Sequence, residues 1–140
     1  MKKTNKGFSM VELIIVIAIM AILAGAIAPA LIKYINKSRL SADVSNAQTI
    51  ASSITSALSD EDAFSDAIAI TAAASLAGNK DIKGNFATQL TEALSGWNTM
   101  KIKAKKDMDG TPFTSDNYLI TLDPASSKVE VYIGDSSHMA

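Results

Sequence analysis

Residues that commonly perform catalysis are scarce in this sequence. There is no cysteine, which excludes a disulfide, a thiolate metal site and a cysteine nucleophile. The single histidine, His138, lies close to the C-terminus, so the sequence offers only this one residue as the base of a serine–histidine catalytic pair. No motif for binding a nucleotide, a phosphate or another cofactor is present. The sequence therefore predicts a protein that is not an enzyme and that has no cofactor and no metal ion.

Two motifs suggest binding chemistry but have simpler explanations. Asp107-Met-Asp109-Gly110 resembles part of a calcium loop, but the third ligand before the glycine and the closing glutamate are missing, which favours a plain turn. A row of lysines directly precedes this motif, at positions 101, 103, 105 and 106. Such a row can contact phosphate groups, but lysine on an exposed strand also prevents unwanted strand pairing. We expect a solvated face and predict no specific nucleic-acid partner.

Glu12 is the acidic residue whose position most needs an explanation. The 20 residues from Leu13 to Ile32 carry no charge. As a helix they would span roughly 30 Å, about the thickness of the hydrocarbon core of a bilayer. A carboxylate inside an apolar span costs ~2.5–3.5 kcal/mol at the helix centre and less near an end. Glu12 should therefore have a partner, and the dipole of a helix N-terminus would add ~0.3–1 kcal/mol of stabilisation.

Charge is divided between the two ends of the chain. Residues 1–39 carry six basic side chains and one acidic one, a net charge of +5. Residues 60–140 carry seven lysines and twelve acidic residues, a net charge of −5. The sequence thus joins a basic, apolar N-terminal part to an acidic, soluble part, and it is not that of a uniform soluble globule.

Two general explanations of the apolar N-terminus leave Glu12 unaccounted for. A cleaved secretory signal peptide would use the basic residues before the run and the small residues Ala26 and Ala28 as its cleavage site. Glu12 is out of place in such a peptide, and Pro29 would hinder the protease. A single-pass membrane anchor has the right length, but three basic residues flank each side and give no orientation.

A third explanation accounts for Glu12, because residues 6–13 resemble the processing site of type IV prepilins. In that family a short basic leader ends in glycine, the next residue is usually phenylalanine, and a glutamate stands fifth after the cut. The resemblance implies a leader over residues 1–7, cleavage between Gly7 and Phe8, and N-methylation of Phe8. It also implies that Glu12 acts in subunit assembly by pairing with the Phe8 ammonium of its own or a neighbouring subunit. Within one helix the two residues, four apart, would share a face. Gly-Phe-x-x-x-Glu before a long apolar run is a specific signal, and the resemblance extends to about Arg39.

One long helix is expected from about Phe8 to Ser59. Its first half, over about residues 8–32, is apolar on every side and should be buried in lipid or among other helices. Its second half has a helical stripe that should pack on the soluble domain, made of Leu40, Val44, Ala47, Ala51, Ile54 and Leu58. The polar residues of this half are assigned to its other faces, and they are Lys37, Arg39, Asp43, Ser45, Gln48 and Ser52.

Gly25 and Pro29 should weaken the helix between its halves. Pro29 lacks the N–H that would bond the carbonyl of Gly25, and its ring crowds that carbonyl. Pro29 also stands where many pilins have a helix-kinking proline. A passive kink is one interpretation, and a segment that melts or stretches when subunits pack into a filament is the other.

The soluble part divides into a helical connecting region over residues 60–98 and an antiparallel sheet over residues 99–140. The expected elements are helices over 63–77 and 86–95, ended by glycine at 78 and 96, and strands over 99–106, 118–122 and 129–133. Trp97 should anchor the core. The sheet residues expected to cover the helix are Met100, Ile102, Ile120, Val129 and Val131. The predicted fold class is α+β, a long helix packed on a small antiparallel sheet of about three strands.

These observations together predict a type IV major pilin, a structural subunit that polymerises through its N-terminal helix. The family resemblance implies three partners besides further copies of the chain: a prepilin peptidase, a pilus assembly platform and the cytoplasmic membrane before assembly. It implies a single-pass membrane prepilin that becomes part of an extracellular filament for adhesion, motility or aggregation. Two alternatives remain, a pseudopilin of a type II secretion or competence system and a membrane-tethered binding domain that never polymerises.

Overall fold

The structure is a computed structural model that describes residues 7–67, 70, 73–123, 126 and 128–134. The chain falls into two units, residues 1–35 and residues 36–140. The predicted leader before Gly7, the end of the chain after Gly134 and most of the loop at 124–127 lie outside the described residues.

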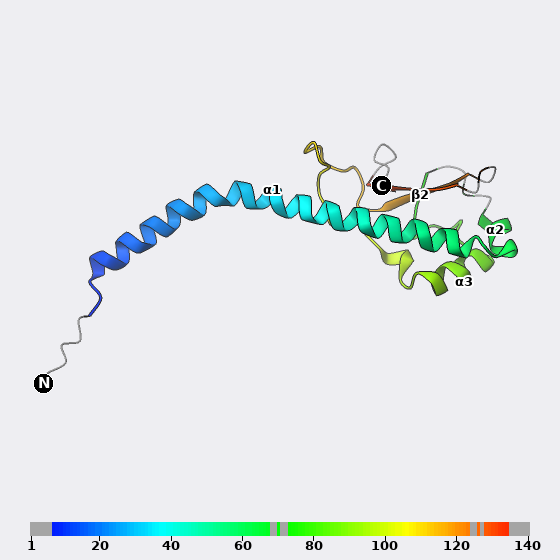
Figure 1. The fold of residues 1–140 in the computed structure, drawn as a ribbon, viewed down its shortest axis with the longest axis horizontal. Helices are drawn as coiled ribbons and strands as arrows, with labels where there is room; N and C mark the ends of the chain where they lie inside the picture. The colour runs from blue at the N-terminus through cyan, green and yellow to red at the C-terminus, as the bar shows by residue number, and fades with distance from the viewer. Residues whose placement is uncertain (1–6, 68–69, 71–72, 124–125, 127, 135–140) are drawn as a thin grey trace, which may run out of the picture. The chain divides into compact units, whose positions relative to one another are not determined.

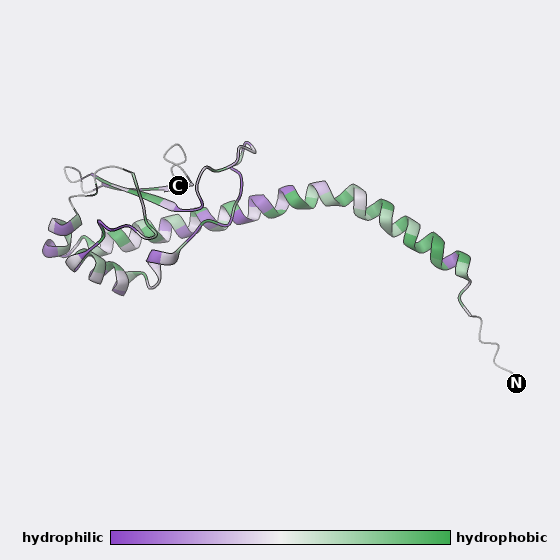
Figure 2. Ribbon diagram, turned by 180° about the vertical axis from the view of Figure 1, so that it is seen from behind, coloured by the Kyte–Doolittle hydropathy of each residue, from purple (hydrophilic) through white to green (hydrophobic). Residues whose placement is uncertain are grey.

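The first unit consists of the start of helix α1, which runs from Met10 to Ala57 and includes Pro29 (Figure 1). Every described side chain from Gly7 to Ile35 is exposed. In Figure 2 most of this part of the helix has the colour of hydrophobic residues. By its length and composition alone α1 is able to cross a membrane. The prediction of one long helix from about Phe8 to Ser59 is confirmed to within two residues at each end.

The second unit is built around residues 36–57 of α1. The sheet lies along one side of this stretch and helix α3 (Gly84–Ala93) along the other (Figure 1). The helix residues buried in this unit are Leu40, Asp43, Ala47, Ile50, Ile54 and Ala57. Three members of the predicted stripe, Leu40, Ala47 and Ile54, are therefore confirmed, while Val44, Ala51 and Leu58 lie at its partly buried edges. Ile50, which is fully buried, was missing from the prediction, because a helix covered on two sides buries a wider band than one stripe.

The sheet has three antiparallel strands in the order β1-β2-β3. β2 (Tyr118–Asp123) and β3 (Lys128–Ile133) form a hairpin in which Tyr118 faces Ile133 and Asp123 faces Lys128. β1 (Ala74–Ser75) pairs with β2 through Ala74 opposite Ile120. On β2 the side chains of Tyr118, Ile120 and Leu122 point into the core and alternate with half-buried or exposed ones. The predicted α+β class, three-stranded sheet and last two strands are confirmed.

The strand predicted over residues 99–106 is wrong. The backbone there is extended but makes only isolated bridges, from Lys101 to Asn117 and from Lys106 to Pro112. The alternation that suggested a strand is real, because Ile102 and Ala104 are buried and the lysines are exposed. The alternation of apolar and basic residues indicates that one face of an extended segment is buried, but it does not indicate which groups bind the backbone. Here side chains of α1 bind most of the backbone that a neighbouring strand would bind, and residues 113 and 116 bind the rest through two backbone hydrogen bonds.

The helix predicted over residues 63–77 is also wrong in its second half. Helix α2 covers Glu61–Ala67 and starts at a cap in which the Asp60 carboxylate accepts a hydrogen bond from Ala63 N at 2.9 Å. Ala74 and Ser75 belong to β1, because β2 offers these residues backbone hydrogen bonds that override the helix propensity of an alanine-rich segment. Residues 68–69 and 71–72 lie outside the described residues.

Helix α3 confirms the helix predicted over residues 86–95, with a start two residues earlier. Its first turn is tied to α2 by the Asp66 carboxylate, which accepts a hydrogen bond from Asn85 N at 2.8 Å. Gly84 has a φ of +63°, and a Cβ there would collide with that carboxylate, so this turn requires glycine.

Trp97 opens the short 3₁₀ helix η1 (Trp97–Thr99) and is only 8% exposed. Its indole N–H donates to the Thr91 hydroxyl at 3.1 Å. The prediction of a core anchor is confirmed.

Candidate functional site

The N-terminal segment begins with an exposed dipeptide followed by a capped helix. Phe8 is 84% exposed, and a Cβ added to Gly7 would meet nothing within 4 Å. Ser9 caps α1, because its hydroxyl accepts a hydrogen bond from Val11 N at 3.3 Å. The bond between Gly7 and Phe8 thus lies in exposed, non-helical chain directly before the helix, where another protein can reach it.

Glu12 has a structural role that the sequence prediction missed. Its Oε2 accepts a hydrogen bond from Ser9 N at 2.9 Å, so Ser9 and Glu12 form a capping box. The spacing Ser-x-x-Glu ahead of an apolar run was a readable signal for this motif. No hydrogen bond joins Glu12 to Phe8 among the described residues, and the Phe8 nitrogen in this uncleaved chain is an amide. The pairing with a Phe8 ammonium therefore stays a prediction.

The apolar helix that follows presents large side chains without cover. Ile22 is 72% exposed, Ile32 69% and Leu31 51%. The helix continues through Pro29, and the space around Gly25 is open. A run of this length cannot stay exposed to water, so it needs lipid or other polypeptide around it. The predicted weak point at Gly25 and Pro29 stays a prediction.

A polar clamp in the second unit fastens the extended segment 101–106 to α1. Asp43 is fully buried, and its Oδ2 accepts hydrogen bonds from Lys103 N at 2.8 Å and Ala104 N at 2.7 Å. Its Oδ1 accepts one from the Tyr118 hydroxyl at 3.2 Å. A single carboxylate thus joins α1, the extended segment and β2. The assignment of Asp43 to a polar face of the helix was wrong, because its burial is compensated by three donors.

Asn36 forms the second half of the polar clamp, two helical turns before Asp43. Its Oδ1 accepts a hydrogen bond from Lys105 N at 3.1 Å, and its Nδ2 donates to Lys106 O at 3.0 Å. The side chains of Asn36 and Asp43 together bind four backbone groups of residues 103–106. One helix face thus satisfies most of the backbone polar groups of residues 103–106 that a strand would pair in a ladder, while Lys105 O accepts a hydrogen bond from Phe113 N.

Tyr118 sits at the centre of the buried polar contacts. Burial is the largest cause that raises the pKa of Tyr118 to about 12; the neighbouring Asp43 carboxylate contributes to this rise, and the hydrogen bond from Asn46 opposes it. The hydroxyl accordingly stays protonated at neutral pH and serves as a fixed donor to Asp43.

The Asp107–Thr111 segment is a closed turn. The Asp107 carboxylate accepts a hydrogen bond from Thr111 N at 2.8 Å, and Asp107 N donates to Thr111 O at 2.9 Å. Gly110 supplies a positive φ of +92°. Within the described part of the chain no three carboxylate or histidine side chains gather as a metal site would require.

Comparison with known proteins finds one match to the N-terminal segment and one to most of the chain. Residues 2–28 match the family described as the prokaryotic N-terminal methylation motif. The chain is 36% identical over 106 residues to the type IV major fimbrial protein FimA of Dichelobacter nodosus, an alignment that covers 76% of this chain. The chain spans 64% of the length of that relative. No solved structure matches the fold.

Proposed function

The methylation motif and the fimbrial relative support a type IV pilin, and on this premise we propose that the chain is the structural subunit of a type IV pilus. The observation that carries the proposal is the order of three features in one segment. An exposed Gly7–Phe8 bond precedes a capping glutamate, which precedes an apolar helix with no cover of its own. A filament made of bundled helices supplies that cover.

The proposed mechanism begins in the cytoplasmic membrane, where the apolar part of α1 is anchored with the leader on the cytoplasmic side. A prepilin peptidase cuts between Gly7 and Phe8, and the new Phe8 amine is methylated. The ammonium then lies four residues before Glu12, whose Oε1 accepts no hydrogen bond from a described residue. Glu12 can therefore keep its bond to Ser9 N and accept a second one from an ammonium of its own or a neighbouring chain.

Assembly then moves the apolar helix from lipid into the filament core. Lipid tails are as apolar as leucine, so this transfer has no large hydrophobic driving force, and close packing and satisfied polar pairs must contribute. Small side chains allow helices to approach closely, and this part of α1 has them at Ala18, Ala21, Ala24, Gly25, Ala26, Ala28 and Ala30. A segment at Gly25 and Pro29 that can melt would let the helix adapt to the packing.

The proposed partners are further copies of the chain, a prepilin peptidase and a pilus assembly platform. The proposed location is the membrane before assembly and the cell surface afterwards, where the filament serves adhesion, motility or aggregation. The fimbrial relative supports a pilus over a short secretion pseudopilus, because its name describes a major fimbrial protein.

The test combines mass spectrometry with electron microscopy of the cells that make this protein. The N-terminal peptide of sheared surface material should start at N-methylated Phe8, and long filaments should disappear when the gene is deleted. A chain that starts at Pro29 would indicate a signal peptide, and one that retains Met1 would indicate a membrane tether. A chain processed at Phe8 without long filaments would indicate a pseudopilin.

A further inference from the structure

Five cationic side chains gather where α1 enters the second unit. Lys37 and Arg39 lie on α1 itself, next to Asn36. Lys103, Lys105 and Lys106 lie on the extended segment whose backbone Asn36 and Asp43 hold against this part of the helix. We name these five residues the basic cluster. All of them are exposed.

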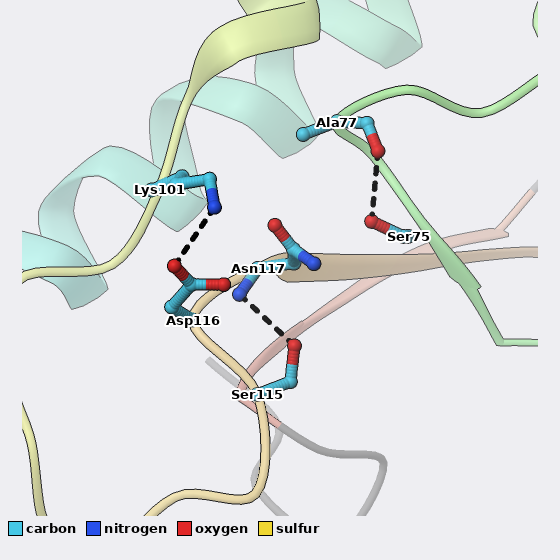
Figure 3. A network of polar contacts seen from close by, with 6 residues as sticks. All are labelled: Ser75, Ala77, Lys101, Ser115, Asp116 and Asn117. Atoms are coloured by element: carbon cyan, nitrogen blue, oxygen red, sulfur yellow. Dashed lines mark hydrogen bonds and ion pairs between the residues drawn. The ribbon is translucent and has the colours of Figure 1, made fainter.

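The charges of the basic cluster are only partly balanced within the second unit. None of its members forms an ion pair with a residue that the structure describes. Lys101 differs, because its ammonium lies 2.8 Å from the Asp116 carboxylate (Figure 3). That hydrogen bond is the largest cause that lowers the pKa of Asp116, and the charge of Lys105 makes a smaller contribution in the same direction. The acidic residues of the adjoining turn are Asp107, whose carboxylate accepts a hydrogen bond from the turn's own backbone, and the exposed Asp109. The buried Asp43 carboxylate, which holds the same segment, is a third acidic group. Five cations against three carboxylates leave an excess of positive charge.

An apolar side chain projects beside the basic cluster. Met108 is 82% exposed at the tip of the closed Asp107–Thr111 turn. The turn continues directly from Lys106, and the bridge between Lys106 and Pro112 closes its base. An apolar tip next to lysines is the combination with which amphipathic protein surfaces bind anionic lipid.

The chain itself keeps the basic cluster close to the end of its apolar run. Lys37 lies five positions after Ile32 in the same helix, a rise of about 7.5 Å at ~1.5 Å per residue. A membrane that holds the run up to Ile32 therefore has its headgroups near Lys37. The attraction of lysine and arginine to an anionic leaflet acts within a Debye length of about 8–10 Å of the surface.

We propose that the basic cluster and Met108 dock the second unit onto the anionic lipid headgroups of the membrane that anchors α1. The docked state precedes assembly, and it rests on the membrane-anchored stage of the proposed function. Docking would hold the second unit at the membrane surface until the assembly of a filament displaces it.

The absence of cysteine allows a site-specific test on the full chain. A single cysteine in Met108→Cys is labelled with an environment-sensitive dye, and the protein is reconstituted into vesicles of phosphatidylcholine alone or mixed with anionic phosphatidylglycerol. The same dye on Glu61→Cys, exposed in the first turn of α2, is the control position. We expect a blue shift and quenching by brominated lipid only for the label at position 108 and only in anionic vesicles. High salt should reverse both.

Charge removal tests the basic cluster with a matched control. Each lysine near an anionic surface strengthens binding about fivefold, so Lys103→Gln, Lys105→Gln and Lys106→Gln together should weaken docking about 100-fold. The matched variant Lys80→Gln, Lys83→Gln and Lys128→Gln removes the same charge elsewhere and should leave docking unchanged. Trp97 fluorescence reports that both variants are folded.

Several results would overturn the proposal. These are a label at position 108 that stays solvated in anionic vesicles, equal effects of the two triple variants, and a dye shift that depends on the ratio of protein to lipid in neutral vesicles. The last result would indicate contact with a second copy. Flotation of the protein with the vesicles reports anchoring separately, so a chain that floats but does not dock overturns only this inference. A chain that fails to float overturns the membrane stage of the proposed function as well.

Discussion

Removal of the Asp43 carboxylate should strongly destabilise the second unit. In Asp43→Ala the N–H groups of Lys103 and Ala104 and the hydroxyl of Tyr118 lose their acceptor together. A buried donor left without a partner costs about 1–3 kcal/mol, and the higher helix propensity of alanine returns about 0.6 kcal/mol. Because Lys103 is exposed, its N–H can bind water in the variant, whereas Ala104 and Tyr118 are buried. We therefore expect the free energy of unfolding to fall by about 3–5 kcal/mol.

The companion variant Asp43→Asn separates hydrogen bonding from charge. Its amide oxygen can still accept from the two backbone N–H groups, but these bonds lose the strength that a charged acceptor gives. We expect a loss of about 1–2 kcal/mol. Ser52→Ala is the control on the same helix, because Ser52 is exposed and, among the described residues, its hydroxyl bonds only to the Gln48 carbonyl. It should change stability by less than about 0.5 kcal/mol.

The assay is urea unfolding of the full chain in mild detergent, followed by the fluorescence of Trp97, the single tryptophan. Trp97 belongs to the core of the second unit, so its emission reports that unit and not the apolar helix. If Asp43→Ala unfolds at the same urea concentration as the parent, the polar clamp does not hold the unit together. If Asp43→Asn is as unstable as Asp43→Ala, the charge is the source of the stability and the number of hydrogen bonds is not.

Three further predictions follow from the same structure. Ile54→Asp places an unpaired charge at a fully buried position and should leave the second unit unfolded by circular dichroism and Trp97 fluorescence, whereas Thr55→Asp on the exposed face should not. In an alkaline titration followed by tyrosinate absorbance, one of the three tyrosines should ionise last, near pH 12, and a Tyr118→Phe chain that still shows the late step would contradict the assignment to Tyr118. Because the folded pKa of Tyr118 lies above the ordinary value of 10.0, its contribution to stability is present below pH 10 and is lost as the pH rises toward 12. Glu12→Val should leave membrane insertion and cleavage intact but abolish filaments, since an unpaired buried ammonium costs ~3–5 kcal/mol in every subunit, and abundant filaments of this variant alone would refute the charge pair.

The features that sequence reasoning predicted well are those with a long or repeated signal. The long helix has an uninterrupted apolar run followed by helical periodicity, and both patterns predict a helix without any knowledge of tertiary contacts. The last two strands are rich in β-branched and aromatic residues and lie next to turn residues. The family resemblance came from a short N-terminal segment, and the matched motif and the fimbrial relative support it.

The features that sequence reasoning missed depend on contacts between distant residues. β1 has only Ala74 and Ser75, which have no strand preference of their own, and it exists because β2 offers a partner. Asp43 was assigned to solvent because a carboxylate is usually exposed, and only the folded chain shows its three donors. One sequence signal was available, since Asp43 is the single charged residue between Arg39 and Asp60.

The polar clamp joins residues that are far apart in the sequence, which has a consequence for the folding of the second unit. Asp43 binds Ala104 across 61 residues of sequence and Tyr118 across 75. Contacts of such separation form only after the entropy of closing a long loop has been overcome, whereas a helix forms from local bonds within about a microsecond. During synthesis α1 is therefore complete while its core face, with Ile50 and Ile54, is still uncovered. Since a chain grows by about 5–20 residues per second, that apolar face waits several seconds for β2 and β3 to emerge.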